Sequence, residues 1–544
     1  MTNGIFRVPA AVNEPIRGYA PGSPERASLQ ARLSELSRER VEIPCVIGGK
    51  EVRTSTTTEV TMPHLRSHVL AELHHAGNPE VQQAIAAATV AAPDWSRTAW
   101  EDRAAIFLRA AELLGGPWRD TLSASTMLGQ SKTAHQAEID AACESIDFLR
   151  FNVEFMTRIY AEQPTSSAGV WNRTDYRPLE GFVFAVSPFN FTAIGLNLAS
   201  APALMGNTVV WKPAESAALS AYYTERLFRA AGLPDGVINV VHGHGPPIGE
   251  AALTSPDLAG IHFTGSTATF QHLWRDVGNR IDTFRTYPRL VGETGGKDFI
   301  VAHPSADVAA LAAATVRGAF EYQGQKCSAA SRMYVPSNLW PELRERLVAE
   351  TETISMGDPS DFSNFMGAVI DEPALAKHRA ALELARTSAD TAIAVGGEID
   401  DTDGLFVEPT IVETADPSFE LLREEVFGPI LTAYVYPENR SEETLDLVDA
   451  TSPYGLTGAI FATEQVALSA GADALRNAAG NIYFNDKPTG AVVGQQPFGG
   501  SRASGTNDKA GSMWNLVRWV SPRTMKETFV PPDDYRYPFL GPDT

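Results

Sequence analysis

One cysteine stands in a setting suited to nucleophilic chemistry. Cys327 lies in the run Gly-Gln-Lys-Cys-Ser at residues 324–328, whereas buried structural cysteines usually lie among aliphatic residues. The thiolate is the reactive form of cysteine, and a neighbouring cation or a helix N-terminus lowers the thiol pKa. We expect Lys326 to supply that cation and the Ser-Ala-Ala stretch from residue 328 to open a helix. Taken alone, however, a cysteine in a loop is more often a spare thiol.

A glutamate upstream provides the base that a nucleophile needs. Glu293 lies in the run Val-Gly-Glu-Thr-Gly-Gly-Lys at residues 291–297, so it is also surrounded by glycines. A carboxylate and a thiol that are both on glycine-rich turns meet the requirement for a general base near an activated nucleophile. Cys327 and Glu293 together therefore predict covalent catalysis through a thiol.

Alternating strands and helices surround these two residues. Apolar runs that end in polar turns predict strands at 182–186, 208–211, 237–241 and 260–263. A second series follows Lys297, with strands predicted at 299–301, 333–335 and 431–435. Repeated strand–helix units imply parallel sheets, which bind ligands at the carboxyl ends of their strands. A cleft between two α/β lobes would then hold both catalytic side chains.

Polar side chains follow the predicted strands where a ligand would bind. Asn190 offers an amide donor for an oxyanion or a cap for the next helix, and its position does not separate these interpretations. Lys212 and Glu215 follow the second strand and can bond ribose hydroxyls, although the isolated motif is more typical of a helix start. Gly265 and Ser266 open a helix whose backbone N–H groups suit a pyrophosphate.

Three further segments are candidates for binding or for loops. Residues 424–429, Glu-Glu-Val-Phe-Gly-Pro, offer a carboxylate for a second ribose and a ring for a nicotinamide, or they simply end a helix. The glycine-rich residues 490–500 can form an anion nest for a substrate carboxylate, or a surface loop. The run 243–249 has its glycines at the wrong spacing for a dinucleotide fingerprint, so we interpret it as a surface loop.

Composition argues against several classes of function. The 544 residues carry a formal net charge of −22, which argues against a nucleic-acid or anionic-membrane partner. The 3 cysteines give neither a disulfide framework nor a zinc site, and the 11 histidines show no ligand spacing, so we expect no metal. The N-terminus lacks an apolar segment behind a basic stretch, and no apolar run is long enough to span a bilayer. We therefore expect a cytoplasmic protein in a reducing compartment.

A series of motifs resembles the aldehyde dehydrogenase superfamily, and the resemblance extends from about residue 43 to residue 528. The motifs are Pro-Phe-Asn-Phe at 188–191, Trp-Lys-Pro at 211–213, Phe-Thr-Gly-Ser at 263–266, Glu-Thr-Gly-Gly-Lys at 293–297, Gly-Gln-Lys-Cys at 324–327 and Glu-Glu-Val-Phe-Gly-Pro at 424–429. Residues 320–329 and 485–500 resemble, more narrowly, the 1-pyrroline-5-carboxylate dehydrogenase branch. Superfamily members often carry a glycine where this chain has Phe270, whereas this branch often has a bulky residue there.

The resemblance implies a fold and a division of the chain. The fold is α/β and aldehyde dehydrogenase-like, with a Rossmann-type NAD-binding domain, an α/β catalytic domain and a small β oligomerisation ribbon. The implied units are an N-terminal arm at 1–40, the NAD-binding domain at 41–162 and 179–296, the ribbon at 163–178 and 522–544, and the catalytic domain at 297–521. Paired ribbons imply a homodimer or a higher homo-oligomer.

The resemblance also implies an activity. The chain would be an NAD-dependent oxidoreductase that converts L-glutamate γ-semialdehyde, formed from 1-pyrroline-5-carboxylate, to L-glutamate in the second step of proline catabolism. Cys327 would form a thiohemiacetal held by Asn190, hydride would pass to NAD, and Glu293 would activate the water that hydrolyses the thioester. A proline dehydrogenase is a candidate partner, and we expect this chain to be the monofunctional form.

Further roles follow from the same resemblance. The cofactor contacts that it implies are Ser187, Pro188, Lys212, Glu215, Gly265, Ser266, Thr267, Glu425 and Phe427. The substrate contacts that it implies are Ser328, Gly490, Ala491, Phe498 and Glu138, the last of them near the amino end of the substrate. The charge of Glu215 would repel the extra phosphate of NADP and so favour NAD.

Two other functions stay open at this point. One is a dehydrogenase for another short carboxylated aldehyde, which a substrate panel that includes succinic semialdehyde would distinguish. The other is a non-enzymatic binding or structural role on the same fold. A binding module needs none of Cys327, Glu293 and Asn190, so their joint presence argues against that role.

Overall fold

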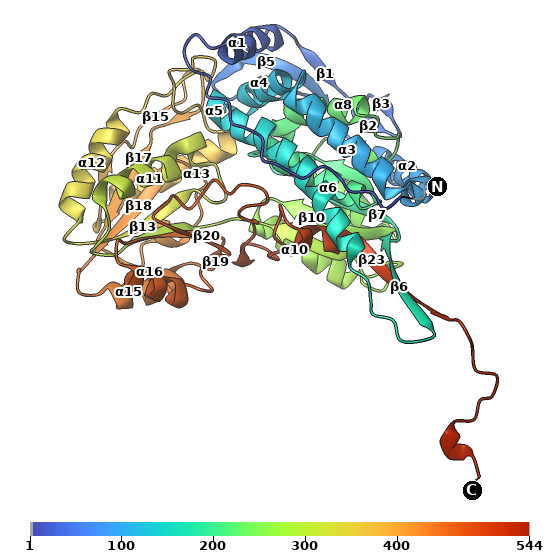
Figure 1. The fold of residues 1–544 in the computed structure, drawn as a ribbon. Helices are drawn as coiled ribbons and strands as arrows, with labels where there is room; N and C mark the ends of the chain where they lie inside the picture. The colour runs from blue at the N-terminus through green and yellow to red at the C-terminus, as the bar shows by residue number, and fades with distance from the viewer. Residues whose placement is uncertain (1–3, 543–544) are drawn as a thin grey trace.

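Two lobes and a projecting ribbon make up the protein (Figure 1). The computed structural model describes residues 4–542. One lobe contains most of the chain up to β11, and the other contains most of the residues that follow Gly296. Among the described residues, no helix is both long enough and apolar enough to cross a bilayer.

The first lobe is built on a sheet with the strand order β11-β10-β7-β8-β9-β2-β3. These strands are β11 (Arg289–Glu293), β10 (Leu258–Thr264), β7 (Phe182–Val186), β8 (Thr208–Lys212), β9 (Ile238–Val240), β2 (Cys45–Ile47) and β3 (Lys50–Val52). The pairs from β11 to β9 are parallel, which confirms the predicted parallel series. The turns after these strands therefore lie at one edge of the sheet, where ligands bind.

Both faces of this sheet are covered. Phe182 and Phe184 of β7 pack in one apolar core, and Val183 and Ala185 pack in another, as expected for a strand whose successive side chains point to opposite faces. The covering helices are α2 (Asn78–Arg97), α3 (Trp100–Gly115), α4 (Arg119–Gln130), α6 (Ser145–Ala161), α7 (Thr192–Leu204), α8 (Ala218–Ala230), α9 (Gly245–Leu253) and α10 (Thr267–Asn279). A small sheet of β1 (Val41–Ile43), β5 (Leu65–His74) and β4 (Thr57–Met62) and helix α1 (Pro24–Leu36) complete the lobe.

Helix α9 corrects the interpretation of residues 243–249 as a surface loop, because the helix begins at Gly245. Pro246 and Pro247 lie in its first turn. Proline is tolerated there because the first N–H groups of a helix have no intrahelical acceptor. The two prolines therefore mark a helix start.

The second lobe has a sheet with the order β14-β17-β18-β13-β12-β20-β21. Its strands are β14 (Thr391–Val395), β17 (Thr410–Thr414), β18 (Ile430–Tyr436), β13 (Ala330–Pro336), β12 (Asp298–Ala302), β20 (Thr457–Phe461) and β21 (Asn481–Phe484). Strand β14 is antiparallel to its neighbour and the other pairs are parallel. The larger helices of this lobe are α11 (Val308–Phe320), α12 (Trp340–Glu352), α13 (Glu372–Thr387), α15 (Ser441–Thr451) and α16 (Gln465–Ala474).

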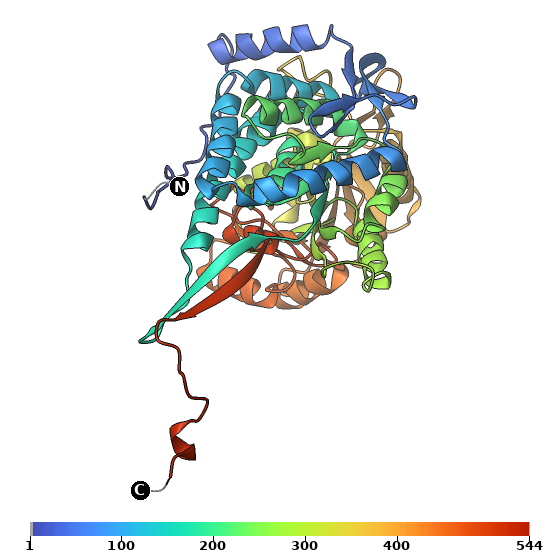
Figure 2. The same ribbon diagram turned by 90° about the vertical axis from the view of Figure 1, so that its right-hand side faces the viewer.

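A two-stranded ribbon projects from the first lobe (Figure 2). Strand β6 (Val170–Pro178) pairs antiparallel with β23 (Val520–Thr528) of the same chain. The sequence places the second strand at 522–544, but the pairing ends at Thr528 and residues 529–542 contain no strand. Pro531 and Pro532 follow, and a proline has no N–H to donate to a strand partner.

The chain returns to the first lobe before it enters the ribbon. Helix α17 (Met513–Leu516) lies against α6, and Leu516, Trp519 and Val520 pack in the core of the first lobe. By packing, these residues belong to the first lobe, although the sequence assigns everything up to residue 521 to the catalytic domain. The division into separate domains otherwise stays a prediction.

Candidate active site

Cys327 lies in a tight turn between α11 and β13 of the second lobe. A short helical segment, η3 (Glu321–Gly324), precedes it and contains two non-glycine residues with φ angles of 53° and 54°. Gly324 has φ +64°, and a Cβ atom there would lie 2.3 Å from the carbonyl oxygen of Gly428. Only glycine tolerates this approach, so the glycine of the Gly-Gln-Lys-Cys motif is a packing requirement.

The surroundings of Cys327 raise the pKa of its thiol, so the lowering that we expected from Lys326 is wrong. Lys326 Nζ lies 3.0 Å from Glu321 Oε2, and this carboxylate neutralises its charge. The residues after Cys327 lead into strand β13 and not into a helix. Burial raises the thiol pKa well above its ordinary value, and the negative charge of Glu293 raises it further. The thiol therefore needs a base to become nucleophilic.

Glu293 is the last residue of β11, at the sheet edge where ligands bind. Its side chain and that of Cys327 line the same cavity. Glu293 Oε1 is buried and has no hydrogen-bond partner among residues 4–542. Burial raises the pKa of Glu293 well above its ordinary value, against the opposing influence of the Gly500 N–H and Lys509. A carboxylate of raised pKa is the stronger base once it is ionised, which suits general-base chemistry near neutral pH.

A cavity of about 580 Å³ has walls from both lobes. Its size is that of a small-molecule site. The catalytic and substrate residues that the sequence predicts are mostly found in its wall, and those found there are Glu293, Cys327, Ser328, Gly490, Ala491 and Phe498. Residues from three distant parts of the chain are thus brought together as the sequence predicts, and their roles stay a proposal.

One part of the cavity wall is suited to an anion. Ser328 Oγ lies 2.7 Å from Thr489 Oγ1. Gly490 has φ +97°, and a Cβ atom there would lie 3.0 Å from Lys487 Nζ. A hydroxyl pair, a positive-φ glycine and an ammonium group on one wall provide the donors that bind a carboxylate.

Asn190 connects the sheet edge of the first lobe to the nucleophile turn. Its side chain is buried, and Nδ2 donates to the carbonyl oxygen of Gln325 at 3.0 Å. Asn190 does not cap the next helix, because Phe191 occupies the cap position and Asp140 accepts the first N–H groups of α7. The cap interpretation is therefore wrong. The amide has a second hydrogen, which is available to an oxyanion, although Asn190 is outside the described lining of the cavity.

Glu138 does not contact the substrate's amino end, and that prediction is wrong. Its side chain is 0% exposed and is outside the described lining of the cavity. Its carboxylate pairs with Arg119 and accepts hydrogen bonds from the Tyr19 hydroxyl at 2.7 Å and the Arg17 N–H at 2.8 Å. Burial alone would raise the pKa of Glu138, but these bonds hold it below its usual value. Glu138 therefore anchors the N-terminal arm.

The predicted cofactor contacts of the first lobe gather at one sheet edge, in the turns after β7, β8 and β10. They are Ser187, Pro188, Lys212, Glu215, Gly265, Ser266 and Thr267. Ser266 caps α10, since its Oγ accepts the Thr269 N–H at 3.2 Å. The other N–H groups of the first turn have no helical acceptor and suit a pyrophosphate. A carboxylate, a lysine and a helix N-terminus along one edge of a parallel sheet fit a dinucleotide.

The segment at residues 424–429 reaches this edge from the second lobe. Glu425 Oε1 accepts the Gly296 N–H at 2.8 Å, so the segment lies against the loop that follows Glu293. The Phe427 ring packs edge-on against Phe189, with ring centroids 5.8 Å apart. Phe427 therefore lies beside the turn that carries Asn190, and Glu425 lies beside the loop that follows Glu293.

Several wall residues have no signal in the sequence. Asn13, Glu14 and Ile16 of the N-terminal arm line the cavity. Asn13 Nδ2 donates to the Val493 carbonyl oxygen at 2.9 Å, so the arm closes against the glycine-rich loop. Glu144 also lines the cavity, and burial raises its pKa to about 8. The arm has no periodic pattern or chemical motif that would indicate this contact.

Comparison with known proteins decides the family. Residues 51–525 match the model of the aldehyde dehydrogenase family. The chain belongs to this family. The resemblance that the motifs suggest is thereby confirmed, and the two-lobed α/β fold is the aldehyde dehydrogenase fold.

Relatives of this aldehyde dehydrogenase are named for one activity. The chain is 51% identical to the mitochondrial Delta-1-pyrroline-5-carboxylate dehydrogenase of Mus musculus over 97% of this chain and 94% of the relative. It is 50% identical to the mitochondrial Delta-1-pyrroline-5-carboxylate dehydrogenase of Dictyostelium discoideum over 98% and 96%. A crystal structure of the Mycobacterium tuberculosis enzyme of that name, bound with NAD, has 52% identity and a TM-score of 0.96, and covers 99% of this chain and 100% of that chain.

Proposed function

We propose that this aldehyde dehydrogenase oxidises L-glutamate γ-semialdehyde, the open form of 1-pyrroline-5-carboxylate, to L-glutamate with NAD. One observation carries the proposal: Cys327 and Glu293 line a single cavity that also has a wall of anion-binding groups. Relatives with about half of their residues identical over nearly the whole chain are named for this activity. The cavity supplies a nucleophile, a base and a carboxylate anchor, which are the parts that this substrate needs.

Cys327 acts first in the proposed reaction. Its thiol loses a proton to a base, and its sulfur forms a bond to the aldehyde carbon while the carbonyl π electrons move to oxygen. The resulting oxyanion lies near the Cys327 N–H and the second amide hydrogen of Asn190. NAD, when it is bound, supplies the acceptor for the hydride that leaves this carbon. Cys327 then carries a thioester.

Glu293 completes the reaction. Its carboxylate takes a proton from water, and the water oxygen attacks the thioester carbon. The carbon–sulfur bond breaks, and the sulfur leaves as the Cys327 thiolate. Cys327 is buried and both side chains line the same cavity, so the water that reacts is the one that Glu293 holds beside the thioester.

The substrate would be held at its carboxylate end. We assign this role to Ser328, Gly490 and Ala491, with Lys487 as an added cation and Phe498 along the aliphatic part. This arrangement favours a carboxylated aldehyde over an apolar one, because an apolar end would leave the hydrogen-bond donors of this wall without an acceptor.

The decisive experiment is a comparison of substrates and cofactors. We expect NADH to form from 1-pyrroline-5-carboxylate with kcat/KM at least about tenfold above that for succinic semialdehyde, which lacks the amino group. We also expect kcat/KM with NAD to exceed that with NADP by about tenfold or more, because Glu215 repels a ribose phosphate. Equal rates with succinic semialdehyde would favour the broader alternative, a dehydrogenase for short carboxylated aldehydes.

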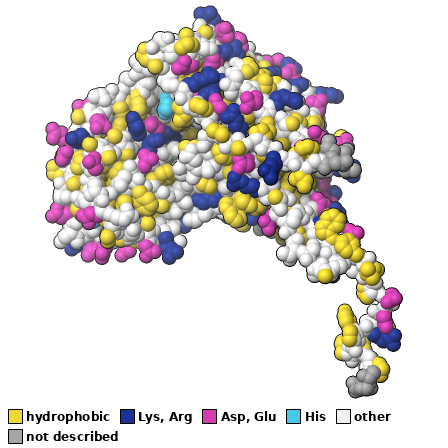
Figure 3. Space-filling model, viewed as in Figure 1, with side chains coloured by type: hydrophobic (Ala, Val, Ile, Leu, Met, Phe, Trp, Pro, Cys, Tyr) yellow, Lys and Arg dark blue, Asp and Glu magenta, His cyan; other side chains and the backbone are white. Residues whose placement is uncertain are grey.

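We propose further that the ribbon and tail hold a homo-oligomer together. Hydrophobic side chains (yellow in Figure 3) follow the ribbon and the tail, which project from the body. Exposed apolar residues there are Trp171, Phe529, Val530, Tyr535, Tyr537, Phe539 and Leu540. Several exposed apolar side chains on a projecting element are typical of a subunit interface.

Sedimentation velocity tests this proposal. We expect the full chain to sediment as a dimer or a larger assembly, and a chain that ends at Thr528 to sediment as a smaller species with an unchanged circular dichroism spectrum. Tyr287→Ser removes an equally exposed aromatic residue elsewhere (82% exposed) and should leave the assembly intact. If the chain that ends at Thr528 forms an assembly with the same number of subunits as the full chain, the tail has no role in assembly.

Compartment and partner remain predictions of the sequence. We propose the cytoplasm from composition, whereas the relatives from Mus musculus and Dictyostelium discoideum are named mitochondrial. A proline dehydrogenase remains the candidate partner, because its product would be the substrate proposed here.

A further inference from the structure

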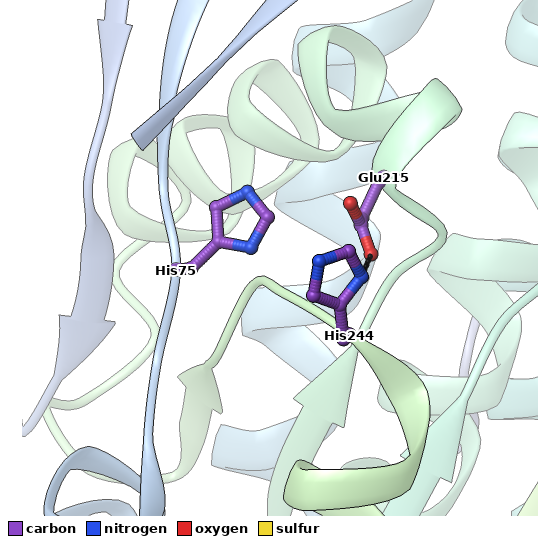
Figure 4. Close-up of side chains that lie close together, drawn as sticks. All are labelled: His75, Glu215 and His244. Atoms are coloured by element: carbon purple, nitrogen blue, oxygen red, sulfur yellow. Dashed lines mark ion pairs between the residues drawn. The ribbon is translucent and has the colours of Figure 1, made fainter. Parts of the chain in front are cut away.

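Two histidines and a glutamate from distant parts of the chain meet near the predicted cofactor contacts (Figure 4). His75 directly follows β5, Glu215 opens the short segment η2 (Glu215–Ala217) after β8, and His244 directly precedes α9. One ligand atom of each residue lies within 4.8 Å of the others. His244 Nδ1 and Glu215 Oε1 are 3.1 Å apart.

We propose that the His75–Glu215–His244 cluster binds a transition-metal ion of the zinc class, and that this ion and NAD exclude each other. Two imidazole nitrogens and one carboxylate oxygen form a ligand set that zinc uses, with a fourth position open to water. Calcium and magnesium prefer sets made of oxygen atoms, so this cluster suits them less well.

His75 has the features of a ligand rather than those of an ordinary buried histidine. It is 6% exposed, and its Nδ1 is buried without a hydrogen-bond partner in the described part of the chain. Its Nε2 lies 2.7 Å from the Thr58 hydroxyl. When Nε2–H donates to that oxygen, Nδ1 carries the lone pair, and a fixed second nitrogen is how proteins orient a ligating imidazole. Coordination would satisfy an atom that otherwise pays the full desolvation penalty.

The distances suit coordination after a small adjustment. Zinc binds imidazole nitrogen and carboxylate oxygen at about 2.0–2.2 Å, so two ligand atoms of a tetrahedral site lie roughly 3.3 Å apart. The His244–Glu215 pair, at 3.1 Å, already matches this spacing. The other separations are at most 4.8 Å, a difference that rotation of the His244 and Glu215 side chains, both partly or largely exposed, can close.

Burial favours the neutral form of the His75 imidazole. Burial lowers the pKa of His75, while Glu215 opposes the shift and His244 and Lys212 add to it. Lys212 is the neighbour that disfavours a metal cation, and burial also lowers its pKa. The carboxylate of Glu215 offsets that ammonium, and the two histidines supply the remaining ligands.

The proposed metal site and the predicted NAD site share Glu215, so the metal ion and NAD should compete. Glu215 is the carboxylate that we assign to the adenosine ribose, and an ion bound to it would take the lone pairs and the space that the ribose hydroxyls need. This part of the inference rests on the proposed function, because it depends on where NAD binds. The binding of the metal ion does not depend on the proposed function, because it is measured without cofactor and without turnover.

Zinc calorimetry on the full chain tests the site. The protein carries Cys327→Ser, which removes a thiol that would compete for zinc. We expect one zinc ion per chain, and at least tenfold weaker binding after His244→Gln, whose side chain is exposed and whose loss should not unfold the protein. His272→Gln removes an exposed histidine of α10 and should leave zinc affinity unchanged. Equal zinc affinity before and after His244→Gln would overturn the site.

A second titration tests the exclusion. NAD affinity should fall as zinc saturates the Cys327→Ser protein, and the same zinc concentration should have little effect on NAD binding after His244→Gln. The cobalt-substituted protein should show ligand-field absorption without a sulfur-to-cobalt charge-transfer band. An NAD affinity that is independent of bound zinc would overturn the exclusion. Failure of the proposed function would appear separately, as absent NADH formation from 1-pyrroline-5-carboxylate in the metal-free enzyme.

Discussion

Replacement of Cys327 by serine should lower steady NADH formation by about 10⁴-fold or more, while NAD binding stays nearly intact. A serine hydroxyl fits the volume of the thiol but is a far weaker acid, and the site already disfavours a negative charge on this side chain. Burial and Glu293 raise the thiol pKa. The same surroundings would therefore hold the hydroxyl fully protonated.

Three measurements check this result. NADH absorbance gives the rate, calorimetry gives NAD affinity, and mass spectrometry of enzyme quenched during turnover detects an acyl group on Cys327. Cys45→Ala is the matched control, because Cys45 is a buried thiol outside the cavity lining. An active serine variant, or the absence of any adduct on Cys327 in the native enzyme, would remove covalent catalysis from the scheme.

Glu293→Gln should produce a burst of NADH and then slow steady turnover by about 10²- to 10⁴-fold. The amide keeps the shape of the carboxyl group but cannot take a proton from water, so the thioester persists. We expect one NADH per active chain in the burst, and a long-lived acyl adduct in the mass spectrum. A burst-free trace with an unchanged steady rate would show that another group is the base.

The pH profile provides an independent check on the same residue. Glu293 must be ionised to act, and its pKa is raised from the ordinary 4.5. The steady rate of the native enzyme should therefore rise with pH through that raised pKa, and fall as the carboxyl group is protonated below it. This limb should disappear in Glu293→Gln. Glu144→Gln is the matched control, since Glu144 is another cavity carboxyl of raised pKa, about 8. If the rise of the steady rate with pH disappeared only in the Glu144 variant, Glu144 and not Glu293 would be the base.

Local motifs explain why much of the fold and part of the site could be predicted. The strands of the first sheet are short apolar runs that end in polar turns, and a parallel arrangement brings those turns to one edge. Cys327, Glu293 and the loop at residues 490–500 are each recognisable within a few residues of sequence. Their convergence in one cavity follows once the fold is known.

The errors arose where distant side chains decide the chemistry. Lys326 is adjacent to Cys327 in sequence, but Glu321 neutralises its charge and burial dominates the thiol pKa. The resemblance assigns Glu138 to the substrate, but Arg119 and Tyr19 bind its carboxylate. The spacing of residues in the sequence does not indicate any of these three partners, Glu321, Arg119 and Tyr19. The proposed metal ligands His75 and His244 likewise lie on separate elements with no ligand motif between them, so spacing alone cannot indicate them.

The position of Trp519 has a consequence for synthesis on the ribosome. The Trp519 ring is fully buried in the core of the first lobe. The backbone carbonyl oxygen of Trp519 accepts a hydrogen bond from Asn207 Nδ2 at 2.9 Å. Gly260 of β10 leaves room for the ring, since a Cβ atom there would lie 3.0 Å from it. The core of the first lobe therefore stays incomplete in a nascent chain until Trp519 has left the exit tunnel. Termination before Trp519 would release a chain whose first lobe lacks part of its core and is exposed to chaperones and proteases.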